Sequence, residues 1–171
     1  MRLPSSTSPA RVARPLTFLL VVGLALFAAG PWLFSHNGTL EGWPDATAGL
    51  AATLPAAELL ALEARADSAL AWALVLHRLR AGEGPADALA GTVGDLDAAG
   101  IAGRFNFLLT DGTTIAATAA GDTLCYRCRP DQVVVASEPF DDEPGWNAVP
   151  DRTVLTARPG LVDASPLKPA S

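Results

Sequence analysis

The sequence predicts an α+β domain in which helices and antiparallel strands form separate layers. Between Pro55 and Ala81, apolar residues recur every three or four positions, which indicates a helix. After Gly103 they alternate in short runs separated by turn residues, which indicates antiparallel strands. The chain has 171 residues, of which 50% are hydrophobic and 18% charged, so it can bury a core and is not of the disordered class.

The charge of the chain argues against a nucleic-acid partner. The formal net charge is −6 at pH 7, whereas binding to phosphates needs clustered Lys and Arg. The only charged side chains before Glu41 are three arginines, Arg2, Arg11 and Arg14. A basic start followed by an acidic remainder is typical of a membrane-directed N-terminus on an acidic domain.

An apolar run covers residues 16–29 and leaves three interpretations open. As a helix these residues span roughly 21 Å, short of the ~30 Å hydrocarbon core, and continuing to Phe34 brings the run closer to spanning length but crosses Pro31. The three interpretations are a signal peptide, a membrane anchor over residues 16–34, and a buried element or sequence that is not native to the protein. Hydropathy alone favours the first two.

Each later segment has its own local pattern. Residues 32–35 predict a strand that delivers Asn37 to a loop, because Asn37-Gly38 is a turn signal. Residues 55–81 predict one helix, or two if Asp67 is the N-cap of a second. Residues 86–96 predict a shorter helix. The strands we expect are Phe105–Leu109, Thr113–Thr118, Thr123–Cys128, Gln132–Ala136, Thr153–Ala157 and Leu161–Ala164, arranged as an antiparallel meander.

An ordered set of segments resembles the class II glutamine amidotransferases, closest to their ergothioneine-pathway branch of γ-glutamyl-hercynylcysteine S-oxide hydrolases. The resemblance covers about residues 27–167. The segments that carry it are residues 32–38 (WLFSHNG), 66–68 (ADS), 106–112 (NFLLTDG), 121–124 (GDTL), 135–146 (VASEPFDDEPGW) and 149–152 (VPDR). The segment Ser137-Glu138-Pro139 is the most specific of these.

The resemblance implies an N-terminal-nucleophile fold, an αββα sandwich, and hydrolysis of a γ-glutamyl amide through a thioester on an N-terminal cysteine. The α-amine of that cysteine serves as general base. Asn37 resembles the oxyanion-hole asparagine, Gly38 the residue that donates a backbone N–H beside it, and Asp67 the carboxylate that holds the α-ammonium of the glutamyl group. The family chemistry needs no metal and no organic cofactor. His36 is expected to be structural.

The start of the chain departs from the family pattern. It reads Met1-Arg2, where the family has its nucleophilic cysteine at position 2. Cys125 and Cys128 are not expected to replace it, because residues three apart on a strand face opposite sides. We therefore expect an N-terminally incomplete, inactive member, in which residues 1–30 are an apolar segment of signal or anchor type or a gene-model artefact. Residues 31–167 are then a partial amidotransferase-like domain.

Two functions follow from these expectations. The first is an enzyme, cytoplasmic in its complete form, that acts on a small-molecule γ-glutamyl substrate. The second is a non-catalytic binding domain on the same scaffold. In that case the protein is membrane-anchored or exported, and a membrane is involved only if residues 16–34 are a true anchor.

Overall fold

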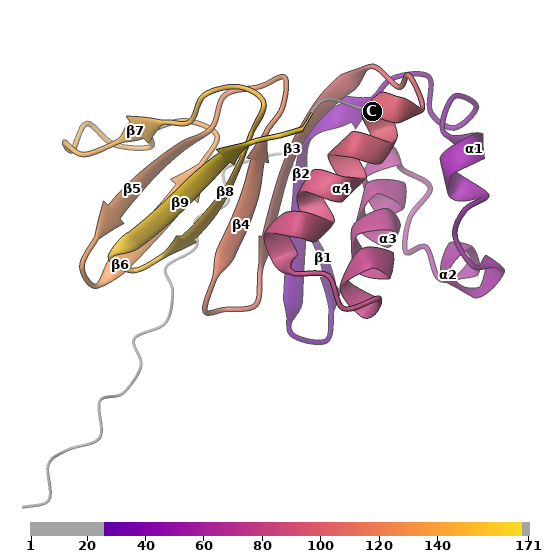
Figure 1. The fold of residues 1–171 in the computed structure, drawn as a ribbon, viewed down its shortest axis with the longest axis horizontal. Helices are drawn as coiled ribbons and strands as arrows, with labels where there is room; N and C mark the ends of the chain where they lie inside the picture. The colour runs from indigo at the N-terminus through magenta and orange to yellow at the C-terminus, as the bar shows by residue number, and fades with distance from the viewer. Residues whose placement is uncertain (1–25, 169–171) are drawn as a thin grey trace, which may run out of the picture.

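The computed structural model describes residues 26–168 (Figure 1). The helices are α1 (Ala48–Ala51), α2 (Ala56–Leu60), α3 (Asp67–Arg80) and α4 (Pro85–Ala98). The strands are β1 (Leu26–Ala29), β2 (Trp32–Leu40), β3 (Gly103–Thr110), β4 (Ile115–Ala119), β5 (Cys125–Arg129), β6 (Gln132–Ala136), β7 (Asn147–Ala148), β8 (Thr153–Arg158) and β9 (Leu161–Pro166). The α+β class that the sequence predicts is confirmed.

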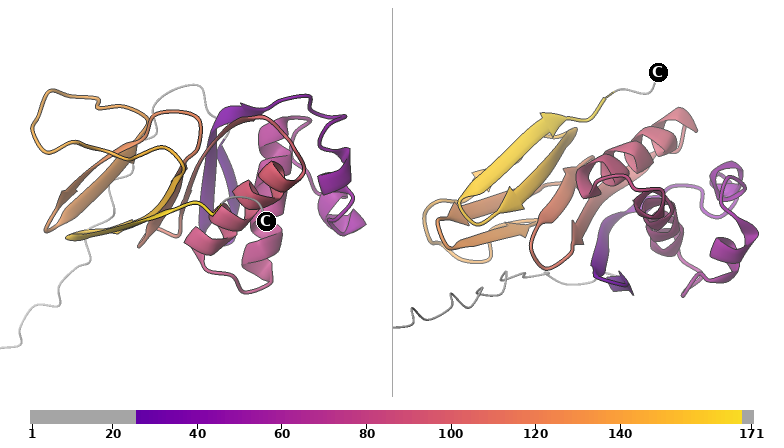
Figure 2. Two further views of the ribbon diagram at one scale, coloured as in Figure 1. Left: turned by 45° about the horizontal axis from the view of Figure 1, so that its top comes forward. Right: turned by 60° about the horizontal axis from the view of Figure 1, so that its bottom comes forward.

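The strands form two antiparallel sheets rather than one meander. Sheet A has six strands in the order β1-β2-β3-β4-β8-β9, and sheet B has three in the order β6-β5-β7. The chain leaves sheet A after β4, builds sheet B, and returns as β8 between β4 and β9. The views in Figure 2 show the strands of sheet B at the end of the molecule away from α1 and α2.

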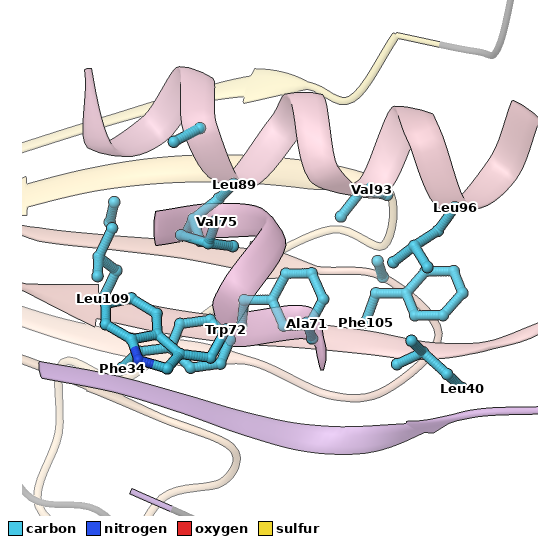
Figure 3. Close-up of a cluster of buried hydrophobic side chains, with 14 of the residues drawn as sticks. Phe34, Leu40, Ala71, Trp72, Val75, Leu89, Val93, Leu96, Phe105 and Leu109 are labelled. Carbon is cyan, nitrogen blue, oxygen red and sulfur yellow. The ribbon is translucent and has the colours of Figure 1, made fainter. Parts of the chain in front are cut away.

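The larger core lies between α3, α4 and one face of sheet A (Figure 3). Phe34 of β2 is fully buried and stacks on Trp72 of α3 with 5.2 Å between ring centroids. It also lies 5.5 Å from the Phe107 ring of β3. Leu89 and Val93 of α4 complete this core. Burying such large side chains is the main favourable term for docking the helices on the sheet.

A second core joins the two sheets. Side chains along β3, β4 and β8 point alternately to the two faces of sheet A. On the face away from the helices, Leu108, Ile115 and Leu155 pack against β6, where they meet Val133 and Val135. Both long helices therefore lie on one side of sheet A and sheet B lies on the other. This order of layers, helices then sheet then sheet, corresponds to three of the four layers of the αββα sandwich that the resemblance implies.

The start of the described chain is a hairpin, not a helix. Leu26–Ala29 pairs with β2, with Phe27 opposite Phe34, and Phe27 is buried against the helices. The interpretation of residues 16–34 as a membrane anchor is therefore not supported, because its last part consists of paired strands. Residues 16–25 lie outside the described residues. Within residues 26–168 no helix has the length and apolar character needed to cross a membrane.

Two local predictions change in the structure. Asn37-Gly38 is not a turn, because β2 continues to Leu40 and pairs with β3 along its length. The stretch 55–81 forms two helices, as in the second alternative, but the N-cap of α3 is Ala66 and Asp67 is its first residue. The Asp67 carboxylate accepts from the adjacent Ser68 N–H and also from the Leu40 N–H at the end of β2.

Candidate functional site

The predicted site residues are brought to one edge of sheet A. Asn37 and Gly38 lie in the second half of β2, and Asp67 is the first residue of α3. Among the residues that the structure describes, β1 pairs with β2 only as far as Ser35. Beyond that point β2 has a neighbouring strand on the β3 side alone, and its other edge can offer backbone groups to a ligand.

The Gly38 N–H points toward this open edge. Successive N–H groups of a strand alternate between its two edges. The Leu40 N–H donates to Asp67 Oδ2 at 2.8 Å and therefore leaves β2 on the side away from β3. Gly38 lies two residues earlier, so its N–H points to the same side, where none of the described strands pairs with it.

Gly38 is a glycine because β3 leaves no room for a side chain. A Cβ built on Gly38 overlaps the carbonyl oxygen of Arg104 and comes within 2.8 Å of His36 Nε2. The strand pair itself therefore excludes a side chain at position 38.

The Asn37 side chain points to the opposite side of sheet A from the helices, toward sheet B. Its Nδ2 donates to Ser137 Oγ at 3.0 Å, across 100 positions of sequence. One N–H of the carboxamide is used in this bond and the second is left for another acceptor. Asn37 is half-buried, so that second N–H lies in partly desolvated surroundings where a hydrogen bond to an anion is strong.

Asp67 is a half-buried anion held by three donors. Its Oδ2 accepts from Leu40 N, and its Oδ1 accepts from the backbone N–H of Ser68 at 2.6 Å and the Ser68 hydroxyl at 3.2 Å. Burial alone raises the pKa of the Asp67 carboxyl, but these donors and nearby His36 outweigh it and hold the pKa below its ordinary value. A carboxylate offers about four lone-pair sites, so Asp67 can still accept from a cation.

His36 is buried beside Asp67 and is held by two contacts. Its Nε2 donates to the Arg104 carbonyl oxygen at 2.9 Å, and its Nδ1 lies 3.1 Å from Ser68 Oγ. Burial lowers the pKa of the His36 imidazole, although the Arg104 bond and the charge of Asp67 oppose this shift. With Nε2 protonated, the neutral ring leaves Nδ1 as an acceptor, and the single proton of the Ser68 hydroxyl bonds either this Nδ1 or Asp67 Oδ1. Both contacts fit a structural role for His36.

Two curated proteins resemble the chain in sequence. A γ-glutamyl-hercynylcysteine sulfoxide hydrolase of Mycolicibacterium smegmatis is 38% identical over 143 residues, covering 84% of this chain and 56% of that protein. A protein of the same name from Mycobacterium tuberculosis is 41% identical over 130 residues, covering 75% of this chain and 48% of the relative. The chain spans about half the length of these relatives. No protein-family model matches it.

Solved structures give the same fold. A class II glutamine aminotransferase domain protein from Silicibacter pomeroyi superposes with a TM-score of 0.70 at 24% identity, covering 86% of this chain and 72% of that one. The glutamine phosphoribosylpyrophosphate amidotransferase of Bacillus subtilis superposes with a TM-score of 0.60 at 18% identity, covering 86% and 32%. The chain is thus similar in sequence to the γ-glutamyl-hercynylcysteine sulfoxide hydrolases and has the fold of the class II glutamine amidotransferases.

The two cysteines of the chain lie in sheet B and are not paired with each other. Burial raises the pKa of the Cys125 thiol, and the Glu138 carboxylate raises it further. A thiol in such surroundings stays protonated and is a poor nucleophile. Among residues 26–168, no three His, Cys, Asp or Glu side chains are grouped so that they could hold a metal ion.

Three further residues belong to the site and were not assigned by the sequence. Ser137 bonds Asn37, and Ser68 lies between Asp67 and His36. Asn106 is opposite Asn37 in the β2–β3 register, and its carboxamide binds the carbonyl oxygens of Asp122 and Thr123. The segments that hold Ser137, Ser68 and Asn106 all carry the resemblance, so those segments were a usable signal.

The arrangement combines N–H donors suited to an anion with a carboxylate suited to a cation. Asn37 offers a side-chain N–H and Gly38 a backbone N–H, while the Asp67 carboxylate is held by the Leu40 N–H, two residues beyond Gly38 in β2. Donors of this kind stabilise the oxygen of a tetrahedral intermediate, and a buried carboxylate binds an ammonium group. A ligand that has both a carbonyl and an ammonium group fits this pattern.

Proposed function

We propose that this chain forms part of a hydrolase that cleaves γ-glutamyl amides, with Asn37 and Gly38 as the oxyanion hole and Asp67 as the ligand of the α-ammonium group. The observation that carries the proposal is the succession along β2 of the Asn37 carboxamide, the Gly38 N–H at the unpaired edge, and the Leu40 N–H that holds the Asp67 carboxylate. The substrate we propose is γ-glutamyl-hercynylcysteine S-oxide, which is the substrate that the names of the relatives describe.

In the proposed reaction a thiolate attacks the γ-carbonyl carbon, and the carbonyl oxygen becomes an oxyanion bound by the Asn37 and Gly38 N–H groups. The C–N bond then breaks, and the amine leaves with the proton that the thiol released to its base. Water hydrolyses the thioester to glutamate and regenerates the thiol. No metal and no organic cofactor takes part in this scheme.

Neither cysteine of the 171-residue chain suits the nucleophile. Cys125 is buried with a raised pKa, and Cys128 lies on the other face of β5, packed toward the second core. We therefore propose that a polypeptide of this sequence alone does not hydrolyse the γ-glutamyl substrate, and that the working protein carries a cysteine at its N-terminus. The cytoplasm is the proposed location of that protein, and cell fractionation tests it.

Glutamate release tests this proposal directly. The protein is purified from its own cells, its intact mass and N-terminal peptide are determined, and it is incubated with the γ-glutamyl substrate before and after thiol alkylation. We expect an N-terminal cysteine and hydrolysis that alkylation abolishes. A protein that starts at Met1-Arg2 and binds the substrate without releasing glutamate contradicts the enzyme and supports the binding-domain alternative.

A further inference from the structure

The connection between Asn37 and Ser137 joins the two sheets at the proposed site. Ser137 immediately follows β6, whose last residue, Ala136, pairs with Cys125 of β5. The Asn37 Nδ2 donates to Ser137 Oγ at 3.0 Å. A free carboxamide rotates about its side-chain torsions, but this bond fixes the direction of one of its two N–H groups. The direction of the second N–H is fixed with it.

Ser137 is itself held in place, because the β5–β6 hairpin is attached to sheet A at both ends. Asn106, the cross-strand neighbour of Asn37, donates to the carbonyl oxygens of Asp122 and Thr123, each at 3.0 Å, just before β5 begins. Asn37 holds the other end through Ser137. Two adjacent carboxamides of sheet A therefore anchor the entry to and the exit from the same hairpin.

The segment after Ser137 is fixed on the outer face of sheet B. Arg127 of β5 binds both carboxylate oxygens of Asp141, at 2.7 and 3.1 Å. Its guanidinium lies 4.7 Å from the ring centroid of Trp146, and the indole N–H of Trp146 donates to Asp141 at 2.9 Å. Bidentate Arg–carboxylate bonds and aromatic stacking restrain a loop more than a single bond does. Ser137 is thus restrained on both sides along the chain.

From this geometry we infer that Ser137 is a positioning residue, which holds the Asn37 carboxamide so that its second N–H faces the reacting carbonyl. The inference rests on the proposed function of Asn37 in the oxyanion hole. Ser137 acts through Asn37 and not on the substrate, so its effect belongs to the transition state, where the oxygen is charged. Substrate binding depends on Asp67 and does not require Ser137.

The kinetic test compares Ser137→Ala with Ser137→Thr in the protein purified from its own cells. Removing an oxyanion-hole donor altogether lowers kcat about 10²–10³-fold, so a donor that is present but not oriented loses less. We expect Ser137→Ala to lower kcat about tenfold with KM unchanged, and Ser137→Thr, which keeps a hydroxyl, to retain most of the rate. The control is Ser165→Ala, which removes the hydroxyl of an exposed residue of β9.

A wild-type kcat in Ser137→Ala overturns the inference and leaves the proposed function intact. A rise in KM with kcat unchanged also overturns the inference, since Ser137 then acts in substrate binding.

If the wild-type protein itself releases no glutamate, the proposed function fails and the kinetic comparison is replaced by NMR of the Asn37 side-chain amide. One slowly exchanging proton in the wild type that becomes fast in Ser137→Ala, but not in Ser165→Ala, supports the positioning contact. Equal exchange in all three proteins overturns it.

Discussion

The carboxylate of Asp67, at the start of α3, accepts a hydrogen bond of 2.8 Å from the backbone N–H of Leu40, at the end of β2. This contact joins the helix layer to the part of the β2 edge that, among residues 26–168, has no neighbouring strand. The Ser68 hydroxyl extends it to the buried ring of His36. The proposed cation-binding and anion-binding groups are therefore fixed to one another through β2 rather than through a flexible loop.

Replacing Asp67 by Asn tests the ammonium-binding role. The Asn side chain keeps an acceptor for the Leu40 N–H but loses the charge. A hydrogen bond to a charged group is worth about 1.5–3 kcal/mol, so we expect KM for a γ-glutamyl amide to rise about 10–100-fold, as measured by glutamate release.

The specificity of that effect has two controls. Asp87→Asn removes an exposed carboxylate from the first turn of α4 and should leave KM unchanged. A substrate without the α-amino group should bind wild type and Asp67→Asn equally weakly. An equal loss of affinity for both substrates means that Asp67 is only structural.

Gly38→Ala is expected to destabilise the β2–β3 pair. The added Cβ overlaps the Arg104 carbonyl oxygen, so the backbone has to move, at a cost of about 1–3 kcal/mol for overpacking. Gly49→Ala in α1 has open space around its Cβ and should be neutral or slightly stabilising. Urea unfolding of the two variants measures the difference. Equal stability of both shows that β3 can move away freely.

Asn106→Ala should cost about 1–3 kcal/mol of stability, because it removes three hydrogen bonds, one of them to the buried backbone of Ala120. The lost partners are the carbonyl oxygens of Asp122 and Thr123 and the N–H of Ala120. Asn147→Ala, which removes a single exposed bond to the Gly145 carbonyl oxygen, should change stability by less than about 0.5 kcal/mol. Similar losses in chemical denaturation contradict the role of Asn106 as an anchor.

The buried imidazole of His36 predicts how stability depends on pH. Burial lowers the pKa of His36 in the folded protein, so between that pKa and about 6.5 the unfolded chain binds more protons than the folded one. The free energy of unfolding is therefore highest above about pH 6.5 and falls as the solution is acidified below it.

Unfolding measured between pH 5 and 8 tests this expectation. His36→Gln should be less stable at every pH but should lose most of the slope in this range. His77→Gln is the control, since His77 is partly exposed and pairs with Glu58 on the helix surface. A slope that persists in His36→Gln shows that another group titrates on unfolding.

Local sequence patterns predict most strands of this fold but not their partners. Gln132–Ala136 is predicted to the residue, and β3 and β8 to within two. The division into two sheets is implied by the resemblance and not by the local patterns, because alternation reports which side chains are buried and not which strand lies alongside. The two-residue strand β7 has no pattern of its own.

The site shows the same limit. Asn37-Gly38 is a turn signal, yet β3 pairs with β2 through this dipeptide, and tertiary pairing outweighs the local preference. Asn37, Gly38 and Asp67 were identified through the resemblance, not through periodicity. Ser137 lies 100 positions from Asn37, so no local pattern could join the two residues. Their contact follows only from the packing of sheet B against sheet A.

The most direct test of the account is the effect of Asn37→Ala on glutamate release by the protein purified from its own cells. We expect kcat to fall about 10²–10³-fold, because one oxyanion donor is lost, while KM changes little. Far-ultraviolet circular dichroism confirms that the variant is folded. A folded Asn37→Ala protein that hydrolyses the γ-glutamyl substrate at the wild-type rate contradicts the account, since the carboxamide then has no part in the reaction.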